Sequence, residues 1–120
     1  MNDIKPIYQN DFGIAFQWKK DKPSQSNKVQ VIFRDIGLLL TQSELRYFSK
    51  CITDTIENGK GNLCGDCKTK ESCRSLLLNS PAHQITFAVS YQEAIEIGDL
   101  ISGTLFKLEL DSFFGELGIE

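Results

Sequence analysis

Three of the four cysteines in this 120-residue chain lie close together, at Cys64, Cys67 and Cys73. Cys64 and Cys67 have the C-x2-C spacing, which places two thiolates about one tight turn apart, and Gly65 between them favours that turn. This spacing is typical of zinc knuckles, in which thiolate sulfur lies about 2.3 Å from zinc. The cluster therefore predicts a zinc site, and a structural role for the metal is favoured over a catalytic one.

A tetrahedral zinc site needs a fourth ligand, and the sequence leaves three choices for it. Cys51 lies on the flank of a predicted helix, His83 is the only histidine, and Asp66 lies within the cluster itself. Because there is one histidine, sites built from several imidazoles are excluded. The predicted ligand set is Cys64, Cys67, Cys73 and Cys51.

Other interpretations of the cluster remain open. In these alternatives, the cysteines are reduced thiols without a ligand, form a disulfide, or bind an iron–sulfur cluster. The C-x2-C-x5-C spacing resembles part of the auxiliary iron–sulfur segment of some radical enzymes, but Leu77 occupies the position of the next cysteine of that segment. The corresponding functions are a thiol-based redox sensor or a metal-dependent enzyme that uses Cys64 and Cys67. Nucleic-acid binding through Lys68, Lys70 and Arg74 is the weakest alternative.

Composition limits the class of protein. A hydrophobic share of 41% in 120 residues fits one domain over 1–120 with a modest core, and the net charge of -3 disfavours a phosphate-dominated nucleic-acid binder. The first residues lack the basic start and apolar run of a secretory signal, and no stretch has the roughly 18 apolar residues of a membrane span. We therefore expect a cytoplasmic protein without a membrane segment, in which cysteines are kept reduced.

Four strands and a helix are predicted before the cysteines. Alternation and turn residues predict strands over 4–9, 12–18, 29–34 and 38–40, with a turn over 35–37 and a solvated loop over 19–28. Thr41 and Glu44 form a capping box that opens a helix, and Asn58-Gly59 predicts its end. A Gly- and Cys-rich excursion covers 57–73. The apolar stripe of the helix is Leu45, Phe48, Ile52 and Ile56, and the 12–18 strand has Phe12, Ile14, Phe16 and Trp18 on one parity.

The second half of the chain repeats this order. Strands are predicted over 74–78 and 83–89, and Ser90 and Glu93 form a second capping box. The alternation over 104–110 leaves a strand possible there, but the helical stripe continues through it and favours helix. The stripe is Ala94, Ile97, Ile101, Leu105 and Leu108; the acidic row Glu93, Glu96 and Asp99 reads as a solvated face. Together these elements predict an α+β fold, a mainly antiparallel sheet packed by two amphipathic helices, with a ββα duplication as one explanation of the repeat.

A second apolar stripe follows the last helix, at steps of four, three and four residues. It lies about 150° from the first stripe, so one chain of this size does not easily bury both. We expect a homodimer that buries the second stripe, which consists of Phe106, Leu110, Phe113 and Leu117.

Several segments together resemble small uncharacterised proteins of Bacteroidetes bacteria. They are the segment 31–38, the cysteine loop, and the segments 73–78, 87–91 and 103–106, so the resemblance spans most of the chain. It implies a bacterial cytosolic setting and carries no established activity or catalytic residues. The sequence as a whole favours a non-enzymatic binding or regulatory module with a cysteine loop that holds a structural zinc.

Overall fold

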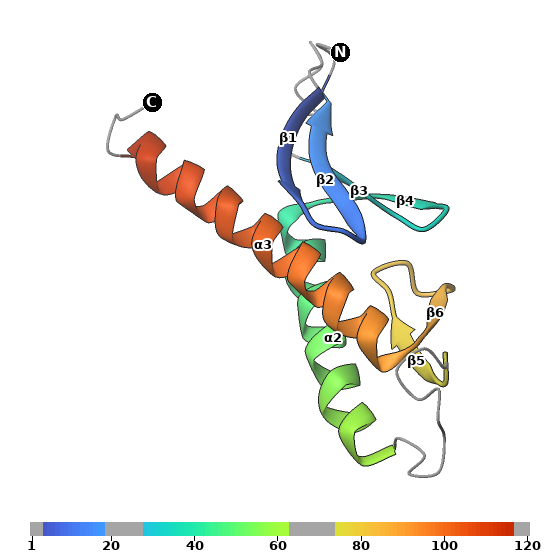
Figure 1. The fold of residues 1–120 in the computed structure, drawn as a ribbon. Helices are drawn as coiled ribbons and strands as arrows, with labels where there is room; N and C mark the ends of the chain where they lie inside the picture. Colours follow the sequence, from blue (N-terminus) through green and yellow to red (C-terminus); the bar gives the residue numbers. More distant parts are fainter. Residues whose placement is uncertain (1–3, 19–27, 63–73, 117–120) are drawn as a thin grey trace.

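The computed structural model describes residues 4–18, 28–62 and 74–116, with only the backbone described at 60–62 and 114–116 (Figure 1). The elements in chain order are β1 (Ile4–Gln9), β2 (Gly13–Trp18), β3 (Val29–Phe33), β4 (Ile36–Leu40), α2 (Gln42–Asn62), β5 (Leu76–Asn79), β6 (Thr86–Val89) and α3 (Tyr91–Glu116). The predicted α+β fold, with antiparallel strands and two amphipathic helices, is confirmed.

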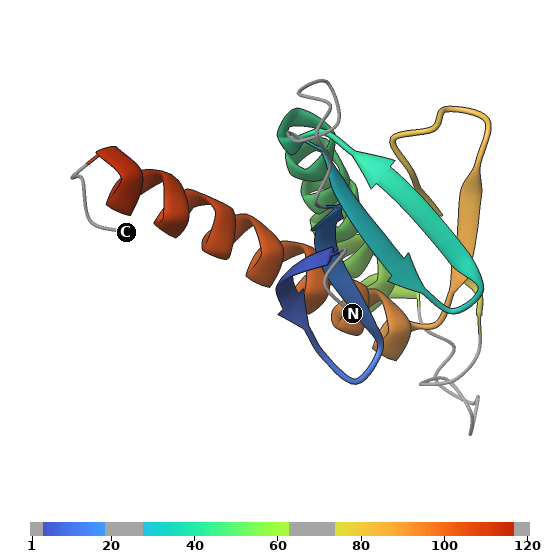
Figure 2. The ribbon, with the colours of Figure 1, turned by 90° about the horizontal axis from the view of Figure 1, so that it is seen from above.

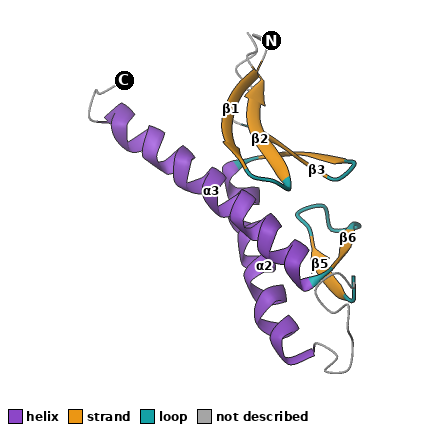
Figure 3. Cartoon of the chain, in the orientation of Figure 1, coloured by secondary structure: helices purple, strands orange, loops and turns teal. Residues whose placement is uncertain are grey.

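The strands form two antiparallel sheets (Figure 3). The first four strands make a meander in the order β1-β2-β3-β4, and β5 pairs only with β6 among the described residues. The β1–β2 and β3–β4 turns lie at the same end of the larger sheet, because Phe33 pairs with Gly13 on one side and with Ile36 on the other. A register shift between Pro6 and Tyr8 bends β1 at the edge of that sheet.

Several strand ends differ from the sequence prediction. β2 begins at Gly13 rather than at 12, and β3 ends at Phe33, so the tight turn is Arg34-Asp35 rather than 35–37. The predicted 74–78 strand is Leu76–Asn79, and the predicted 83–89 strand is only Thr86–Val89. β6 starts later than predicted for a local reason: the Ser80 hydroxyl accepts from the Ala82 amide and lies 2.7 Å from the Ile85 carbonyl oxygen. These bonds hold residues 80–85 in a turn.

The α2 helix begins as predicted and ends later. The Thr41 amide donates to the Glu44 carboxylate at 2.8 Å, and the Glu44 amide donates to the Thr41 hydroxyl at 3.1 Å, so the capping box is confirmed. The predicted end at Asn58-Gly59 is wrong, because α2 continues to Asn62, and the first residues of the 57–73 excursion are therefore helical. Gly59 serves a close contact instead, since a Cβ there would lie 2.9 Å from the Leu76 side chain.

The α3 helix also begins with its predicted capping box. The Ser90 amide donates to Glu93 at 2.9 Å, and the Glu93 amide donates to the Ser90 hydroxyl at 3.0 Å. Residues 104–110 are helical, as favoured. Gly98 lies where α3 meets α2, since a Cβ there would lie 3.1 Å from Ile52. Figure 2 shows the C-terminal half of α3 running out from the rest of the molecule. With this helix included, the chain measures 54 × 28 × 26 Å.

The core lies between the helices and the inner faces of the two sheets. Three phenylalanine rings join its parts: Phe87 on β6 lies 5.5 Å from Phe33 on β3 and 6.2 Å from Phe48 on α2, between ring centroids. The chain thus contains two ββα units, β3-β4-α2 and β5-β6-α3, with a capping box in each. Their strands belong to different sheets, and duplication stays a prediction.

Candidate functional site

Most of the predicted zinc ligands cannot be placed in space. Cys64, Asp66, Cys67 and Cys73 lie outside the described residues. Within the described parts of the chain, no three His, Cys, Asp or Glu side chains come together as a metal site. The zinc site therefore stays a prediction, and the structure describes two of its candidate fourth ligands.

Cys51 lies on α2 at the edge of the core. Its side chain is half-buried and packs against the hydrophobic cluster. Tyr47 lies one helical turn earlier, and hydrogen bonding with the Cys51 thiol raises the pKa of Tyr47. Gly59, which contacts Leu76, follows Cys51 by about 12 Å along the helix axis. Cys51 thus lies roughly two turns from the point where the chain returns to α2.

His83 lies farther from that point. It is exposed in the β5–β6 turn and lines a hollow of about 290 Å³ together with Tyr47 and Pro81. Tyr47 is about 18 Å along α2 from Gly59. Of the two described candidates, Cys51 is therefore the nearer to Arg74, where the described chain resumes after the cysteines.

A charged cluster that the sequence did not predict joins three segments at the N-terminus of α3. Glu93 accepts from Arg34 at 2.7 Å and from two nitrogens of Arg74, the closer at 2.9 Å. The expectation that Glu93 lies on a solvated acidic face is wrong. Its capping role was visible in the sequence, but its partners are 59 and 19 residues away along the chain, and no local pattern marks such pairs.

Two arginines and a backbone amide control the charge of Glu93. Burial alone would raise its pKa, but hydrogen bonds from Arg74, the Ser90 amide and Arg34 outweigh burial and lower that pKa to about 2. The carboxylate is therefore ionised throughout the physiological range. This fixed charge holds the β3–β4 turn and the start of β5 against the first turn of α3.

Arg34 holds its position at a conformational cost. It is the first of the two residues in the β3–β4 turn and has a φ of 53°, a region in which glycine is the usual residue. Its guanidinium donates to the Ala88 carbonyl at 3.0 Å as well as to Glu93, while its buried Nε has no hydrogen-bond partner among the described residues. The ion pair and the bond to β6 explain why an arginine occupies a glycine position.

A second cluster attaches the β1–β2 turn to α3. Asp99 accepts from the Tyr8 hydroxyl and from the Asn10 side chain, each at 3.0 Å, and the Tyr8 bond to Asp99 raises the pKa of Tyr8. The Tyr8 ring lies against Gly103. Asp99 is exposed, as expected of a solvated face, but its hydrogen bonds to the distant Tyr8 and Asn10 were not predicted from the sequence. Both acidic residues hold hairpins on the helix.

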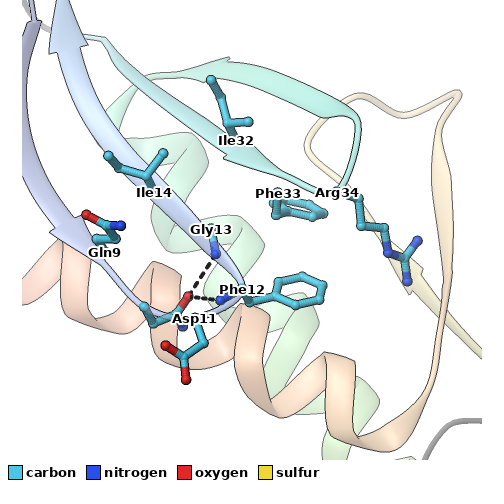
Figure 4. Close-up of a pocket in the computed structure, with 9 residues that line it drawn as sticks. Gln9, Asp11, Phe12, Gly13, Ile14, Ile32, Phe33 and Arg34 are labelled. Atoms are coloured by element: carbon cyan, nitrogen blue, oxygen red, sulfur yellow. Dashed lines mark hydrogen bonds between the residues drawn. The ribbon is translucent and has the colours of Figure 1, made fainter.

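The same turn forms a shallow hollow of about 300 Å³ at the end of the larger sheet. Figure 4 shows Ile14 and Ile32 on one side of it and the Arg34 guanidinium directed away from them. The predicted common face of Phe12 with Ile14 is not formed, because Phe12 precedes β2 and stacks on Phe33 at 5.8 Å. Beside its apolar side chains, the lining offers the amides of Gln9 and Asn10 and the charges of Asp11 and Arg34, and none of its described residues is a histidine or a cysteine.

The second apolar stripe lies on the half of α3 that leaves the body. Phe106 is 63% exposed, Phe113 is 54% exposed, and Leu110 is half-buried. Leu117 lies outside the described residues. The first stripe contacts the core, with Ala94, Ile97 and Ile101 buried and Leu105 and Leu108 half-buried. The two stripes are therefore used differently, and the second presents large apolar side chains to the outside.

Neither helix, over the part of the chain that the structure describes, has both the length and the apolar character of a membrane span. The resemblance to small Bacteroidetes proteins stays a prediction. Comparisons with protein-family models, with curated proteins and with solved structures find no match to this chain.

Proposed function

We propose that this protein is a non-enzymatic binding and regulatory module that forms a homodimer through the projecting half of α3. The observation that carries the proposal is the exposure of Phe106, 63%, on a stripe with heptad-like spacing. The occupant is a second copy of this chain, and the seam consists of Phe106, Leu110, Phe113 and Leu117.

Two physical arguments support a covered stripe. Burying one phenylalanine side chain contributes about 1.5–3 kcal/mol, so exposed rings on one seam favour association. An isolated helix of about ten residues is also marginal in water, and the end of α3 extends past β1 and α2 (Figure 2). A partner helix would bury the exposed part of the Phe106 ring, which the described part of the chain leaves uncovered.

The proposal also includes a structural zinc, with Cys64, Cys67, Cys73 and Cys51 as its ligands. Such a site would fix the segment between α2 and β5. The described chain stops at Asn62, three residues after Gly59, and resumes at Arg74. Zinc-bound thiolates persist in a reducing compartment, which supports a bacterial cytoplasm as the setting. The chemistry expected of the site is structural, without an open metal position for a substrate.

The dimer is tested by the molar mass from light scattering during gel filtration, over a range of concentrations. Wild type is expected to show a molar mass above that of the monomer. Phe106→Asp should raise the dissociation constant of the dimer several hundredfold, because two rings are lost per dimer. Ser112→Asp is the matched control: it adds the same charge at an exposed position about 160° round the helix from Leu110. A wild type that stays monomeric, or a Ser112→Asp as weak as Phe106→Asp, would contradict the seam.

The zinc is tested by metal content and thiol titration on protein purified without added metal. One zinc per chain with the four thiols protected is expected, and Cys67→Ser should lose the metal. Four titratable thiols and no metal would overturn the zinc site and favour a redox sensor that uses Cys64 and Cys67. Reversible formation of a disulfide between those two under mild oxidation would then identify that sensor.

A further inference from the structure

The outer face of the four-stranded sheet, which points away from both helices, is also apolar. A Cβ at Gly13 would meet Leu100 of α3, so the odd-numbered residues of β2 face the helices. The even-numbered residues therefore face outward, since side chains alternate along a strand. The register of the sheet places Ile32 opposite Ile14 and Gly37, and Leu39 opposite Gln30, on this outer face.

Large side chains on the outer face are only partly covered. Ile32 is 37% exposed and Leu39 is 42% exposed, both well above the exposure of the residues in the core. Phe16 is buried on this side, and the Trp18 ring lies edge-on against it, 5.1 Å between centroids. Trp18 is in turn held by a 3.1 Å hydrogen bond to Gln30. The face is thus a rigid apolar surface formed by side chains of three strands.

The charges at the two ends of this face have opposite signs. Lys28 directly precedes β3, two residues before Gln30, and Asp35 lies at the other end of β3, in the turn beside Arg34. Neither Lys28 nor Asp35 has an ion-pair partner among the described residues. They are about 23 Å apart along the strand direction. The acidic end also includes Asp11, in the neighbouring β1–β2 turn.

We propose that this outer face binds a second copy of the chain, sheet against sheet, with β3 antiparallel to β3 of its partner. A two-fold axis midway between Lys28 and Asp35 brings each lysine onto the aspartate of the other copy. The same axis brings Ile32 close to its own copy at the centre. Leu39 then lies near Gly37 of the other copy, where no side chain is in the way. The surface is therefore complementary to itself in both charge and shape.

The size of the face limits the strength of this contact. Four strands about 4.8 Å apart and about 20 Å long cover roughly 400 Å² on each copy. The two copies together would bury about 800 Å², less than the roughly 1,200 Å² of the smaller stable interfaces, so the association is weak and depends on its two ion pairs. The proposal goes beyond the α3 seam, because the sheet face and the projecting half of α3 lie on different sides of the molecule (Figure 2). With both contacts, dimers would join into larger assemblies.

The test uses the full chain with Phe106→Asp, so that the α3 seam does not contribute, and measures association by sedimentation from low micromolar to millimolar protein. Lys28→Glu and Asp35→Lys should each weaken association about tenfold, because each places like charges opposite one another. The double swap Lys28→Glu with Asp35→Lys should return it to within about threefold of the parent, because both ion pairs re-form with reversed polarity. Ile32→Lys should abolish association.

Three results would overturn the proposal. They are a Phe106→Asp protein that stays monomeric at all concentrations, a double swap that is no stronger than the single variants, and association that does not fall as salt rises. Circular dichroism checks that each variant is folded; should a swap variant misfold, the salt dependence and Ile32→Lys decide. Failure of the α3 seam appears separately, as a Phe106→Asp protein with the same mass as wild type at every concentration.

Discussion

Gly103→Ala gives a sharp test of how β1 is attached to α3. Alanine is the better helix former by about 1 kcal/mol, so in an exposed helix this change would stabilise the protein. Here a Cβ at position 103 would lie 2.4–2.6 Å from three ring carbons of Tyr8. The ring must move by about 1 Å, and its hydrogen bond to Asp99 moves with it.

The expected magnitude follows from these two opposing terms. Overpacking at a fixed contact costs about 2–3 kcal/mol, which exceeds the helix gain of about 1 kcal/mol. Gly103→Ala should therefore lower the free energy of unfolding by about 1–2 kcal/mol. In a Tyr8→Ala background the clash is absent, and Gly103→Ala should raise the free energy of unfolding by about 1 kcal/mol. The sign of the effect reverses, and the coupling between the two positions is about 2–3 kcal/mol.

The assay is urea unfolding of four proteins: the parent, both single variants and the double variant. All four carry Phe106→Asp and are measured at one protein concentration, because self-association would otherwise add to the apparent stability. Equal m-values are needed for the comparison. A stabilising effect of Gly103→Ala in the presence of Tyr8, or an effect of the same sign in both backgrounds, would refute the close packing of Tyr8 on α3.

Three further predictions concern the charged cluster and the cysteines. Glu93→Gln should lower the free energy of unfolding by about 1–2 kcal/mol after solvent screening. Because the pKa of Glu93 falls from 4.5 to about 2 on folding, this loss of stability should be constant above pH 4.5 and shrink as pH falls towards 2. A loss that does not depend on pH in acid titrations would contradict this prediction. Arg34→Gly and Arg34→Ala both lose the ion pair, but only glycine adopts a φ of 53° without strain. The glycine variant should therefore be the more stable of the two by about 1 kcal/mol in thermal unfolding. Equal stabilities would count against a strained turn. Removal of zinc with a chelator should speed proteolytic cleavage between Asn62 and Arg74 while the far-ultraviolet circular dichroism changes little; unchanged cleavage would oppose a structural metal.

Local sequence patterns were sufficient for most of the fold. The two capping boxes, at Thr41 and Ser90, fixed the helix starts because both partners lie within four residues of each other. Alternation along β2 and β3 indicated strands, and the continuous helical stripe decided residues 104–110. These features depend on short-range hydrogen bonding and on side-chain periodicity, which a sequence displays directly.

The remaining features depend on contacts between distant segments. Gly59 reads as a helix end, but its role is set by Leu76, which packs against it. Arg34 reads as the end of a strand, yet it is the turn residue that reaches Glu93. Asp99 resembles a solvated acid until Tyr8, 91 residues earlier, donates to it. No local pattern carries this information, because each contact forms only when the hairpins meet α3.

We propose above all that the chain works as a homodimer joined through α3, with a structural zinc in each copy. Native mass spectrometry of the wild-type chain, sprayed without reducing or chelating agents, tests both parts in one spectrum, because subunit number and bound metal each change the measured mass. At low micromolar concentration, we predict species with even numbers of chains and one zinc per chain for wild type, and for Phe106→Asp a monomer that keeps its zinc. A wild-type spectrum of metal-free monomers alone would contradict the account.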